Sequence, residues 1–280
     1  MRIGNIAGRA QLIVDGDCAV DIGTASRGQF GPGLAELYER WEEFRKWSPP
    51  ADAAARSYTP DELDNPAPAP RQIFGVGLNY CDHAAEAGAP APEEPLVFTK
   101  FLSSLAAPVA SVPLPPGKVD WEVELVLVIG RAGRHIPEDA AWQHIAGVAV
   151  GQDLSERQLQ STGPMPQFNL AKSFPGFTPI GPVVVTPDEF EDRDDLELGC
   201  SINGEAVQKG RTSNMIFPIP PLIAKLSAVV ELLPGDVIFT GTPAGVGVAR
   251  TPQRFLSQGD ELVSYVTGVG EIRQTFVTAE

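Results

Sequence analysis

The amino-acid sequence predicts a β-rich α+β protein, in which a mixed β-sheet is rolled into a compact barrel or sandwich beside a small N-terminal α/β domain. Three observations favour this class. Gly and Pro, with 28 and 27 copies in 280 residues, make up about a fifth of the chain, against a usual total of about 12%. Most apolar stretches are short and lie between turn residues, as strands do. They do not alternate regularly with helices, which argues against a doubly wound parallel sheet.

The first part of the chain combines short strands with one helix. The apolar stretches Met1–Ala7, Gln11–Val14 and Ala19–Ile22 predict strands, and Asp15-Gly16-Asp17 has the composition of a hairpin turn. A helical period follows Pro32-Gly33. Its apolar face has the spacing i, i+3, i+4, i+7 and i+10 and consists of Leu34, Leu37, Tyr38, Trp41 and Phe44.

Residues 48–70 show neither the alternation of a strand nor the apolar spacing of a helix, and they are rich in Pro and Ala. We expect a linker strapped along the surface here, with a domain boundary near residue 68. The predicted organisation is therefore a small N-terminal domain with its linker over residues 1–68 and a larger domain over residues 69–280.

Strands dominate the larger domain. They are expected at Ile73–Gly77, Leu96–Lys100, Glu122–Ile129, Ala146–Asp153, Ile180–Val185, Leu196–Ile202, Asp236–Thr240, Glu261–Val266 and Ile272–Val277. Helices are expected near Asp82–Ala87, Pro137–Ile145, Ser155–Gln160 and Pro218–Ser227. Pro137 fits the first position of its helix, and Gly147 fits the position just after the end of that helix.

Charge and cysteine content narrow the classes of partner. The formal charge is −15 and the pI about 4.6, so the surface repels phosphate backbones and anionic lipid. We therefore expect neither nucleic acid nor membrane as a partner, whereas a local cation still permits an anionic substrate. The three cysteines are far apart, and the N-terminal segment lacks a signal-peptide core. Both features indicate a cytoplasmic protein.

The most informative stretch runs from Val119 to Gly130. If it is a strand, the side chains of Asp120, Glu122 and Glu124 share one face, because alternate residues of a strand point the same way. Three buried acids in a row would repel each other strongly. Two interpretations remain open: the acids lie on a solvated strand end, or a cation binds between them.

Asp153 favours the cation. It ends another apolar stretch, and a carboxylate from a neighbouring strand end would join the Glu122/Glu124 pair to give three hard oxygen donors. Such a set suits Mg²⁺ or Mn²⁺ with open positions for water and substrate. Zinc fits less well, because no His or Cys lies near these acids in the sequence.

Further candidates are a histidine and two lysines. His83 and Glu86 are three residues apart on an expected helical turn, so Glu86 can orient the imidazole and raise its basicity; a plain surface histidine is the alternative. His135 and His144 have no such setting and are interpreted as structural. Lys100 and Lys172 lie in apolar context, either as ordinary surface residues or as ligands for a carboxylate or enolate.

A glycine-rich loop at residues 239–247 brings backbone amides and Thr hydroxyls together with little side-chain bulk. It lacks the Lys and Ser/Thr of a nucleotide-phosphate loop. We therefore interpret it as a carboxylate-binding turn, with a plain turn as the alternative.

Taken together, these stretches resemble the fumarylacetoacetate hydrolase family, over about Gln72 to the C-terminus. Nine stretches match in order: GLNYCDHAAEAG, PLVFTKF, VDWEVELVLVIG, GQDLSERQLQ, LAKSF with PIGPVVVTPDE, SINGEAVQ, RTSNMIFPIPPLI, LPGDVIFTGTPAGVG and FLSQGDEL. The resemblance implies a catalytic domain of mixed strands rolled around the active site, a homodimer, and bound Mg²⁺ or Mn²⁺.

The resemblance also implies roles for single residues. The metal ligands would be Glu122, Glu124 and Asp153. The dyad that activates water would be His83 with Glu86, on a lid segment, and Lys172 would be the lysine beside the metal. The residues that line or buttress the substrate site would be Arg157, Gln160, Lys100 and Thr242. Three departures leave the substrate open: Gln152 where relatives have Asn, Phe168 where Trp is common, and Pro175-Gly176 where an acid is frequent.

The expected reaction is cleavage of a C–C bond in an acylpyruvate or related 1,3-diketo acid by water, through an enolate held by the ion. Decarboxylation of oxaloacetate and keto–enol tautomerisation or isomerisation of a 2-oxo acid would use the same residues. An interpretation from another class is a metal-binding scaffold without catalysis. The intact His83/Glu86 pair and Lys172 argue against the scaffold, and the His83/Glu86 pair favours hydrolysis over the other two reactions.

Overall fold

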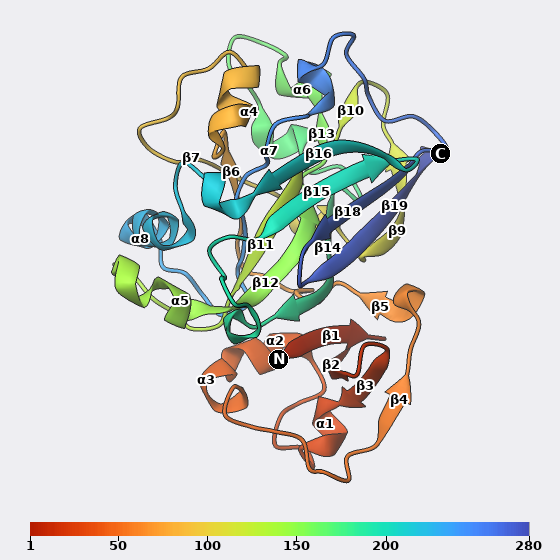
Figure 1. Ribbon diagram of the computed structural model, residues 1–280, viewed down its shortest axis with the longest axis vertical. Coiled ribbons are helices and arrows are strands. Elements are labelled where there is room, and N and C mark those ends of the chain that lie inside the picture. The colour runs from red at the N-terminus through yellow and green to blue at the C-terminus, as the bar shows by residue number, and fades with distance from the viewer. Residues whose placement is uncertain (280) are drawn as a thin grey trace.

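The computed structural model describes residues 1–279. Its largest unit is a mixed 12-stranded sheet in which strands distant in sequence pair with each other (Figure 1). In spatial order the sheet contains β4 (Ala55–Ser57), β3 (Cys18–Asp21), β2 (Arg9–Val14), β1 (Arg2–Ile6), β14 (Thr178–Val185), β12 (Ile145–Gln152), β11 (Val123–Ile129), β17 (Val237–Phe239), β6 (Ile73–Gly77) and β7 (Leu96–Thr99). β5 (Leu63–Asp64) pairs with β1, and β8 (Leu105–Ala106) pairs with β14.

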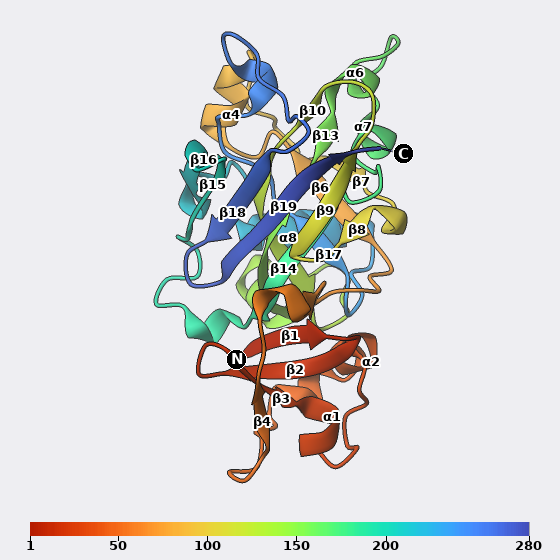
Figure 2. The same cartoon turned by 90° about the vertical axis from the view of Figure 1, so that its right-hand side faces the viewer.

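A second sheet packs against the middle of the long one (Figure 2). Its spatial order is β16 (Glu205–Arg211), β15 (Glu197–Ile202), β18 (Glu261–Val266), β19 (Gly270–Thr278) and β9 (Val109–Leu114). A short pair, β10 (Val119–Asp120) with β13 (Ser155–Glu156), extends the structure beyond β11 and β12.

Short helices cover the edges and ends of these sheets. The α-helices are α1 (Ile22–Ala25), α2 (Leu34–Glu39), α3 (Trp41–Phe44), α4 (Cys81–Glu86), α5 (Ala141–His144), α6 (Arg157–Gln160), α7 (Phe168–Ala171) and α8 (Ile219–Val229). Single 3₁₀ turns lie at Pro60–Glu62, Leu102–Ser104, Glu138–Ala140, Pro187–Glu189, Thr212–Asn214 and Gly247–Ala249. The N-terminal elements gather at one end of the molecule, whereas α4, α6 and α7 lie at the opposite end (Figures 1 and 2).

Strand β11 is buried on both faces, which explains its continuous apolar run. Leu125 and Leu127 face the core between the two sheets. Val126 and Val128 face a second core, where the helices α2 and α3 cover the long sheet. Because side chains alternate along a strand, Glu124 continues the face of Val126 and Val128 at the end that α2 and α3 leave uncovered.

The N-terminal strands agree with the sequence-based prediction, but the helix after them differs from it. The expected single helix is divided at Arg40, where φ is −109° and ψ is 24°, into α2 and α3. Its apolar face nevertheless packs as predicted, with Leu34, Leu37, Tyr38, Trp41 and Phe44 all buried in the second core.

Two other expectations need correction. The expected linker of residues 48–70 contains two short strands, because β4 pairs with β3 and β5 pairs with β1. Pro137 does not occupy the first helical position; it precedes a 3₁₀ turn with ψ of 153°, and α5 begins only at Ala141. The proposed domain boundary near residue 68 stays a prediction.

The cysteines provide a test of this fold. No disulfide joins Cys18, Cys81 and Cys200 within residues 1–279. Cys81 is exposed, whereas Cys200 is buried between the sheets, and burial raises the pKa of its thiol far above the usual value. Since the thiolate is the reactive form, we expect a thiol reagent to modify Cys81 rapidly and Cys200 only on unfolding. Mass spectrometry of peptides from the native and denatured protein measures this, and rapid native labelling of Cys200 would contradict the fold.

Candidate metal centre and active site

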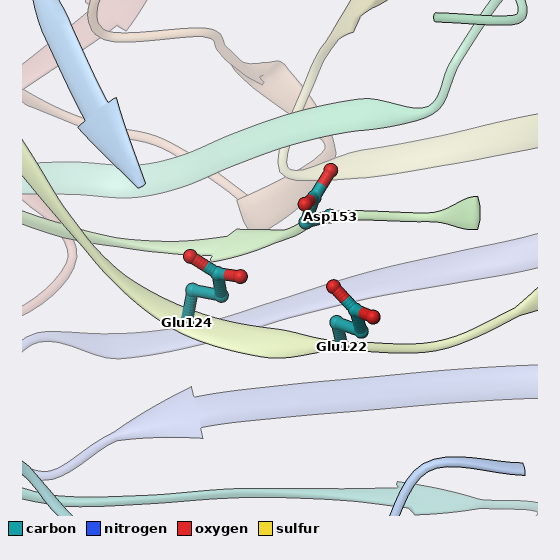
Figure 3. Close-up of side chains that lie close together, drawn as sticks. All are labelled: Glu122, Glu124 and Asp153. Atoms are coloured by element: carbon teal, nitrogen blue, oxygen red, sulfur yellow. The ribbon is translucent and has the colours of Figure 1, made fainter. Parts of the chain in front are cut away.

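Antiparallel pairing of β11 with β12 brings the three acids of the predicted metal site together. Val123 pairs with Gln152, and the backbone N–H of Asp153 donates to the carbonyl of Glu122 at 2.9 Å. One carboxylate oxygen from each of Glu122, Glu124 and Asp153 lies within 4.8 Å of the others. Figure 3 shows the three side chains on the two adjacent backbone segments.

The three acids are buried, so they do not form a solvated strand end. Glu122 is 6% exposed, Glu124 1% and Asp153 0%. Burial, together with Asp153 and Glu122, raises the pKa of Glu124 well above its usual value. Burial also acts on Glu122, but Lys172 and Arg157 outweigh it and hold the pKa of Glu122 below its usual value. The site therefore contains one carboxylate, Glu124, whose charge the protein compensates only in part.

Two buried lysines neutralise the other acids. Lys172 Nζ donates to Glu122 Oε2 at 2.7 Å and to Asp153 Oδ2 at 2.6 Å, and Asp153 with Glu122 raises its pKa despite burial. Lys100 Nζ donates to Asp153 Oδ1 at 2.5 Å and to the carbonyl of Phe177 at 2.8 Å. Lys100 is not among the residues that line the adjacent cavity, so in this structure it supports Asp153 from behind.

A divalent cation fits this arrangement. Among residues 1–279, Glu124 has no cationic side chain as a partner; its Oε2 accepts only the N–H of Gly241 at 2.7 Å. Three clustered carboxylates supply the hard oxygen ligands that Mg²⁺ and Mn²⁺ prefer. An added cation would compensate the charge of Glu124, so the residues present suit such an ion.

Arg157 lies beside the acids and links two of them. Its Nε donates to Asp120 Oδ2 at 2.9 Å and one terminal nitrogen to Glu122 Oε1 at 2.7 Å. The other terminal nitrogen donates to Gln160 Oε1 at 2.9 Å, so the N–H₂ group of Gln160, a residue that lines the cavity, is not used by this contact. Glu156 caps the start of α6 through the N–H groups of Gln158 and Leu159, and this cap fixes the helix from which Arg157 and Gln160 project.

The structure forms the predicted dyad. His83 and Glu86 lie on α4, with His83 Nδ1 2.8 Å from Glu86 Oε1. Burial raises the pKa of Glu86, but hydrogen bonds from His83 and from the N–H of Gly245 more than offset it, and the net direction is downward. An ionised Glu86 therefore holds Nδ1, and Nε2 remains to exchange a proton.

These groups share one cavity of about 370 Å³. Its polar wall includes His83, Glu86, Glu122, Glu124, Arg157, Gln160, Lys172 and Thr242. Its apolar wall includes Phe98 and Phe168, whose rings stack with centroids 5.6 Å apart. Phe98 is a site residue that no motif indicates. Its spacing of two residues from Lys100 on one expected strand is the signal that could have found it, because that spacing places both side chains on one face.

The glycine-rich loop binds carboxylates that belong to the protein itself. The N–H of Gly241 donates to Glu124, and the N–H of Gly245 donates to Glu86 at 2.9 Å. Thr242 Oγ1 donates to the carbonyl of Val123 at 2.8 Å and accepts from Gln208 Nε2 at 2.8 Å. The hydroxyl proton of Thr242 is therefore already used, and only its remaining lone pair can meet a ligand.

Comparison with known proteins identifies related sequences. A family model described as fumarylacetoacetate (FAA) hydrolase C-terminal matches residues 72–277. The chain is 46% identical over 209 residues to the mitochondrial oxaloacetate tautomerase FAHD2A of Homo sapiens, and the match covers 74% of this chain and 67% of that protein. That relative is mitochondrial by name, so the cytoplasmic location stays a prediction. No helix in residues 1–279 is long and apolar enough to cross a membrane.

Solved structures confirm the predicted fold class. A Mycobacterium smegmatis protein provisionally named HpcE is 59% identical, with a TM-score of 0.94 and 100% of both chains covered. A fumarylacetoacetate hydrolase from Exiguobacterium antarcticum is 30% identical, with a TM-score of 0.85 and 100% of both chains covered. Maleylpyruvate hydrolase from Sphingobium sp. SYK-6, in complex with manganese(II) and pyruvate, is 27% identical, with a TM-score of 0.81 and 100% of both chains covered.

Proposed function

Because the chain belongs to the fumarylacetoacetate hydrolase family, we propose that it is a divalent-metal-dependent enzyme that cleaves an acylpyruvate or related 1,3-diketo acid with water. The observation that carries this proposal is the His83–Glu86 pair, formed at 2.8 Å in the wall of the cavity that also contains Glu122 and Glu124. A base held in this way can activate water, which tautomerisation and decarboxylation do not consume.

Each residue has a role that follows from its contacts. His83 Nε2 takes a proton from water, and the resulting hydroxide attacks the distal carbonyl carbon. The bond between C3 and C4 of the diketo acid then breaks, its electron pair goes to the pyruvate enolate, and C3 is protonated. The products are a carboxylic acid and pyruvate. Glu86 keeps the proton on His83 Nδ1 and stabilises the imidazolium that forms.

Positive charge around the enolate comes from Lys172 and Arg157. Two of the three N–H groups of Lys172 are used by Glu122 and Asp153, and the third is free to donate to an enolate oxygen. Gln160 and Thr242 line the same cavity. The amide N–H₂ of Gln160 suits the carboxylate end of the substrate, whereas Thr242 can only accept a hydrogen bond from a donor. Lys100 fixes Asp153 and acts without touching the substrate in this arrangement.

Glu122, Glu124 and Asp153 would hold the ion, either Mg²⁺ or Mn²⁺. When bound, the ion would supply Lewis-acid stabilisation of the negative charge that develops on the enolate. The manganese and pyruvate in the maleylpyruvate hydrolase structure support this assignment by similarity. A small anionic 2-oxo acid as substrate and assembly as a homodimer belong to the same proposal.

A second candidate is tautomerisation or decarboxylation of oxaloacetate. The 46% identity to a protein named oxaloacetate tautomerase favours it. The same dyad could move a proton between C3 and the enol oxygen without activating water, and decarboxylation needs only the ion and the groups around it. The two candidates therefore differ in the need for a water nucleophile.

A substrate panel separates the two candidates. We expect turnover of an acylpyruvate to pyruvate and the free acid with Mg²⁺ or Mn²⁺, and loss of that turnover in EDTA. The panel compares acylpyruvates, fumarylpyruvate and oxaloacetate, with pyruvate release followed by a coupled assay and the enol of oxaloacetate by ultraviolet absorbance. Tautomerisation of oxaloacetate without acylpyruvate cleavage would replace the first candidate by the second. Silence on every substrate despite metal binding would indicate a scaffold.

A further inference from the structure

Asp120 is a buried carboxylate that the proposed mechanism does not use. It is 0% exposed and lies two residues before Glu122. Its Oδ1 accepts from the N–H of Gly247 at 2.7 Å and of Trp121 at 2.8 Å. Its Oδ2 accepts from Arg157 Nε at 2.9 Å and from the N–H of Val248 at 2.9 Å. These four donors fill the acceptor sites of one carboxylate, so Asp120 is unavailable to an ion or a substrate.

The donors to Asp120 come from segments that are far apart in the sequence. Arg157 belongs to α6, beside Gln160, whereas Gly247 and Val248 belong to the loop that follows β17. We call residues 245–248 the dyad loop, because the N–H of Gly245 donates to Glu86 Oε2 at 2.9 Å. Trp121 also holds this loop, through a hydrogen bond from its indole N–H to the carbonyl of Gly245 at 3.2 Å.

The close approach of this loop depends on Gly247. A Cβ atom added there would lie 2.7 Å from Asp120 Oδ1 and 2.0 Å from the carbonyl oxygen of Arg254. Only glycine therefore lets the backbone N–H reach the carboxylate. The loop is packed around Asp120 on one side and presents an N–H to Glu86 on the other.

We propose that Asp120 is a positioning residue that couples Arg157 to the His83–Glu86 dyad through the dyad loop. By its bond to Arg157 it fixes the guanidinium group that contributes positive charge around the enolate. By its bonds to Gly247 and Val248 it fixes the loop that holds Glu86, and through Glu86 the ring of His83. Binding and proton transfer then depend on one carboxylate that touches neither substrate nor base. The role of each end in catalysis rests on the proposed function.

The variant Asp120→Asn tests this coupling. An asparagine keeps the volume but turns an N–H₂ group towards two of the four donors, so two contacts become repulsive. We expect a rise in KM through Arg157 and a fall in kcat of about 10²-fold, because small displacements of a catalytic group have effects of this size. In the His83→Ala background, Asp120→Asn should lower kcat by no more than about twofold further, because both changes act on one unit.

Asp236→Asn is the matched control. Asp236 is also 0% exposed and accepts from the N–H groups of Leu233 and Gln72, but it lies at the start of β17, away from the cavity. It should lose thermal stability like Asp120→Asn and keep both kcat and KM. If both variants change kcat and KM alike, or if the effects of Asp120→Asn and His83→Ala multiply, the coupling is wrong.

Two further measurements keep the proposal testable if Asp120→Asn does not fold or if no substrate is found. Trp121→Phe removes the indole N–H together with part of a fully buried ring. We expect lower kcat with unchanged KM, and an unchanged kcat would contradict the role of the loop. Amide hydrogen exchange of the metal-free protein needs no substrate. In Trp121→Phe or Asp120→Asn, the Gly245 N–H and the segment 81–86 should exchange faster than in wild type and in Asp236→Asn. Wild-type protection there would overturn the coupling even if the proposed function fails independently.

Discussion

Replacing Glu124 by glutamine is expected to abolish the metal-dependent activity while making the metal-free protein more stable at neutral pH. The loss of activity should be about 10³-fold or more. A bound ion contributes several kcal/mol to stabilisation of the developing charge, and each 1.36 kcal/mol corresponds to about tenfold in rate. Added Mg²⁺ or Mn²⁺ at 100 times Kd should stabilise wild type by about 2.7 kcal/mol and so raise its melting temperature. The melting temperature of Glu124→Gln should stay unchanged.

The gain in stability follows from the raised pKa of Glu124. The folded metal-free protein holds the proton more tightly than the unfolded chain. The contribution of Glu124 to the free energy of unfolding is therefore highest below the unfolded pKa of about 4.3, and it is lost as the pH rises through the folded pKa. A glutamine side chain does not titrate, so the free energy of unfolding of Glu124→Gln should rise relative to that of wild type as the pH increases over this interval.

Calorimetry in EDTA at one pH near the unfolded pKa of about 4.3 and at another well above it measures the effect. Glu93→Gln, at an exposed position, serves as the control and should match wild type throughout. A Glu124→Gln variant that is less stable than wild type at the higher pH, or that retains metal-induced stabilisation, would contradict this account of the site.

Replacing His83 by alanine is expected to separate two reactions that share one site. Hydrolysis of an acylpyruvate should fall by about 10²- to 10⁴-fold, the usual contribution of a positioned base. Decarboxylation of oxaloacetate should keep most of its rate, because it needs the ion and the surrounding cations but no activated water. Glu86→Gln should act in the same direction, since Glu86 orients His83 Nδ1 at 2.8 Å.

His135→Asn is the control for this experiment. His135 has a positive φ of 53°, which asparagine tolerates, and it lies outside the cavity. Parallel assays with an acylpyruvate and with oxaloacetate should show both rates at the wild-type level for this variant. An equal loss of both reactions in His83→Ala would mean that the base serves both, and the assignment of water activation to His83 would be wrong.

The sequence predicted the parts of the site that depend on local spacing. The alternation of Glu122 and Glu124 and the i, i+3 spacing of His83 and Glu86 are local features, and the structure has both. The closeness of Asp153 to Glu122 and Glu124 could be inferred because Asp153 ends an apolar stretch that was expected to form a neighbouring strand. The long-range contacts had no such signal. Nothing in the sequence near Lys100 shows that it lies behind Asp153.

For the fold as well, local patterns were predictable from the sequence and long-range pairing was not. Short apolar runs indicated strands, but β9 and β16 were missed because their mixed residues become strands only by pairing with β19 and β15. The glycine-rich loop was interpreted as a carboxylate-binding turn, and its amides do bind carboxylates. That the carboxylates are Glu86, Glu124 and Asp120 depends on tertiary packing, which no local pattern encodes.

The pairing of β1 with β14 has a consequence for how the chain can be divided. Ile3 is in register with Val184, and the helices α2 and α3 cover the face that carries Val126 and Val128. A polypeptide shortened to the region that matches the family model would expose the end of β14 that pairs with β1, together with the apolar face that α2 and α3 cover. Open edges of this kind recruit other chains. The N-terminal segment thus completes the sheet that carries the metal ligands, and we expect the two parts to fold well only when they are expressed together.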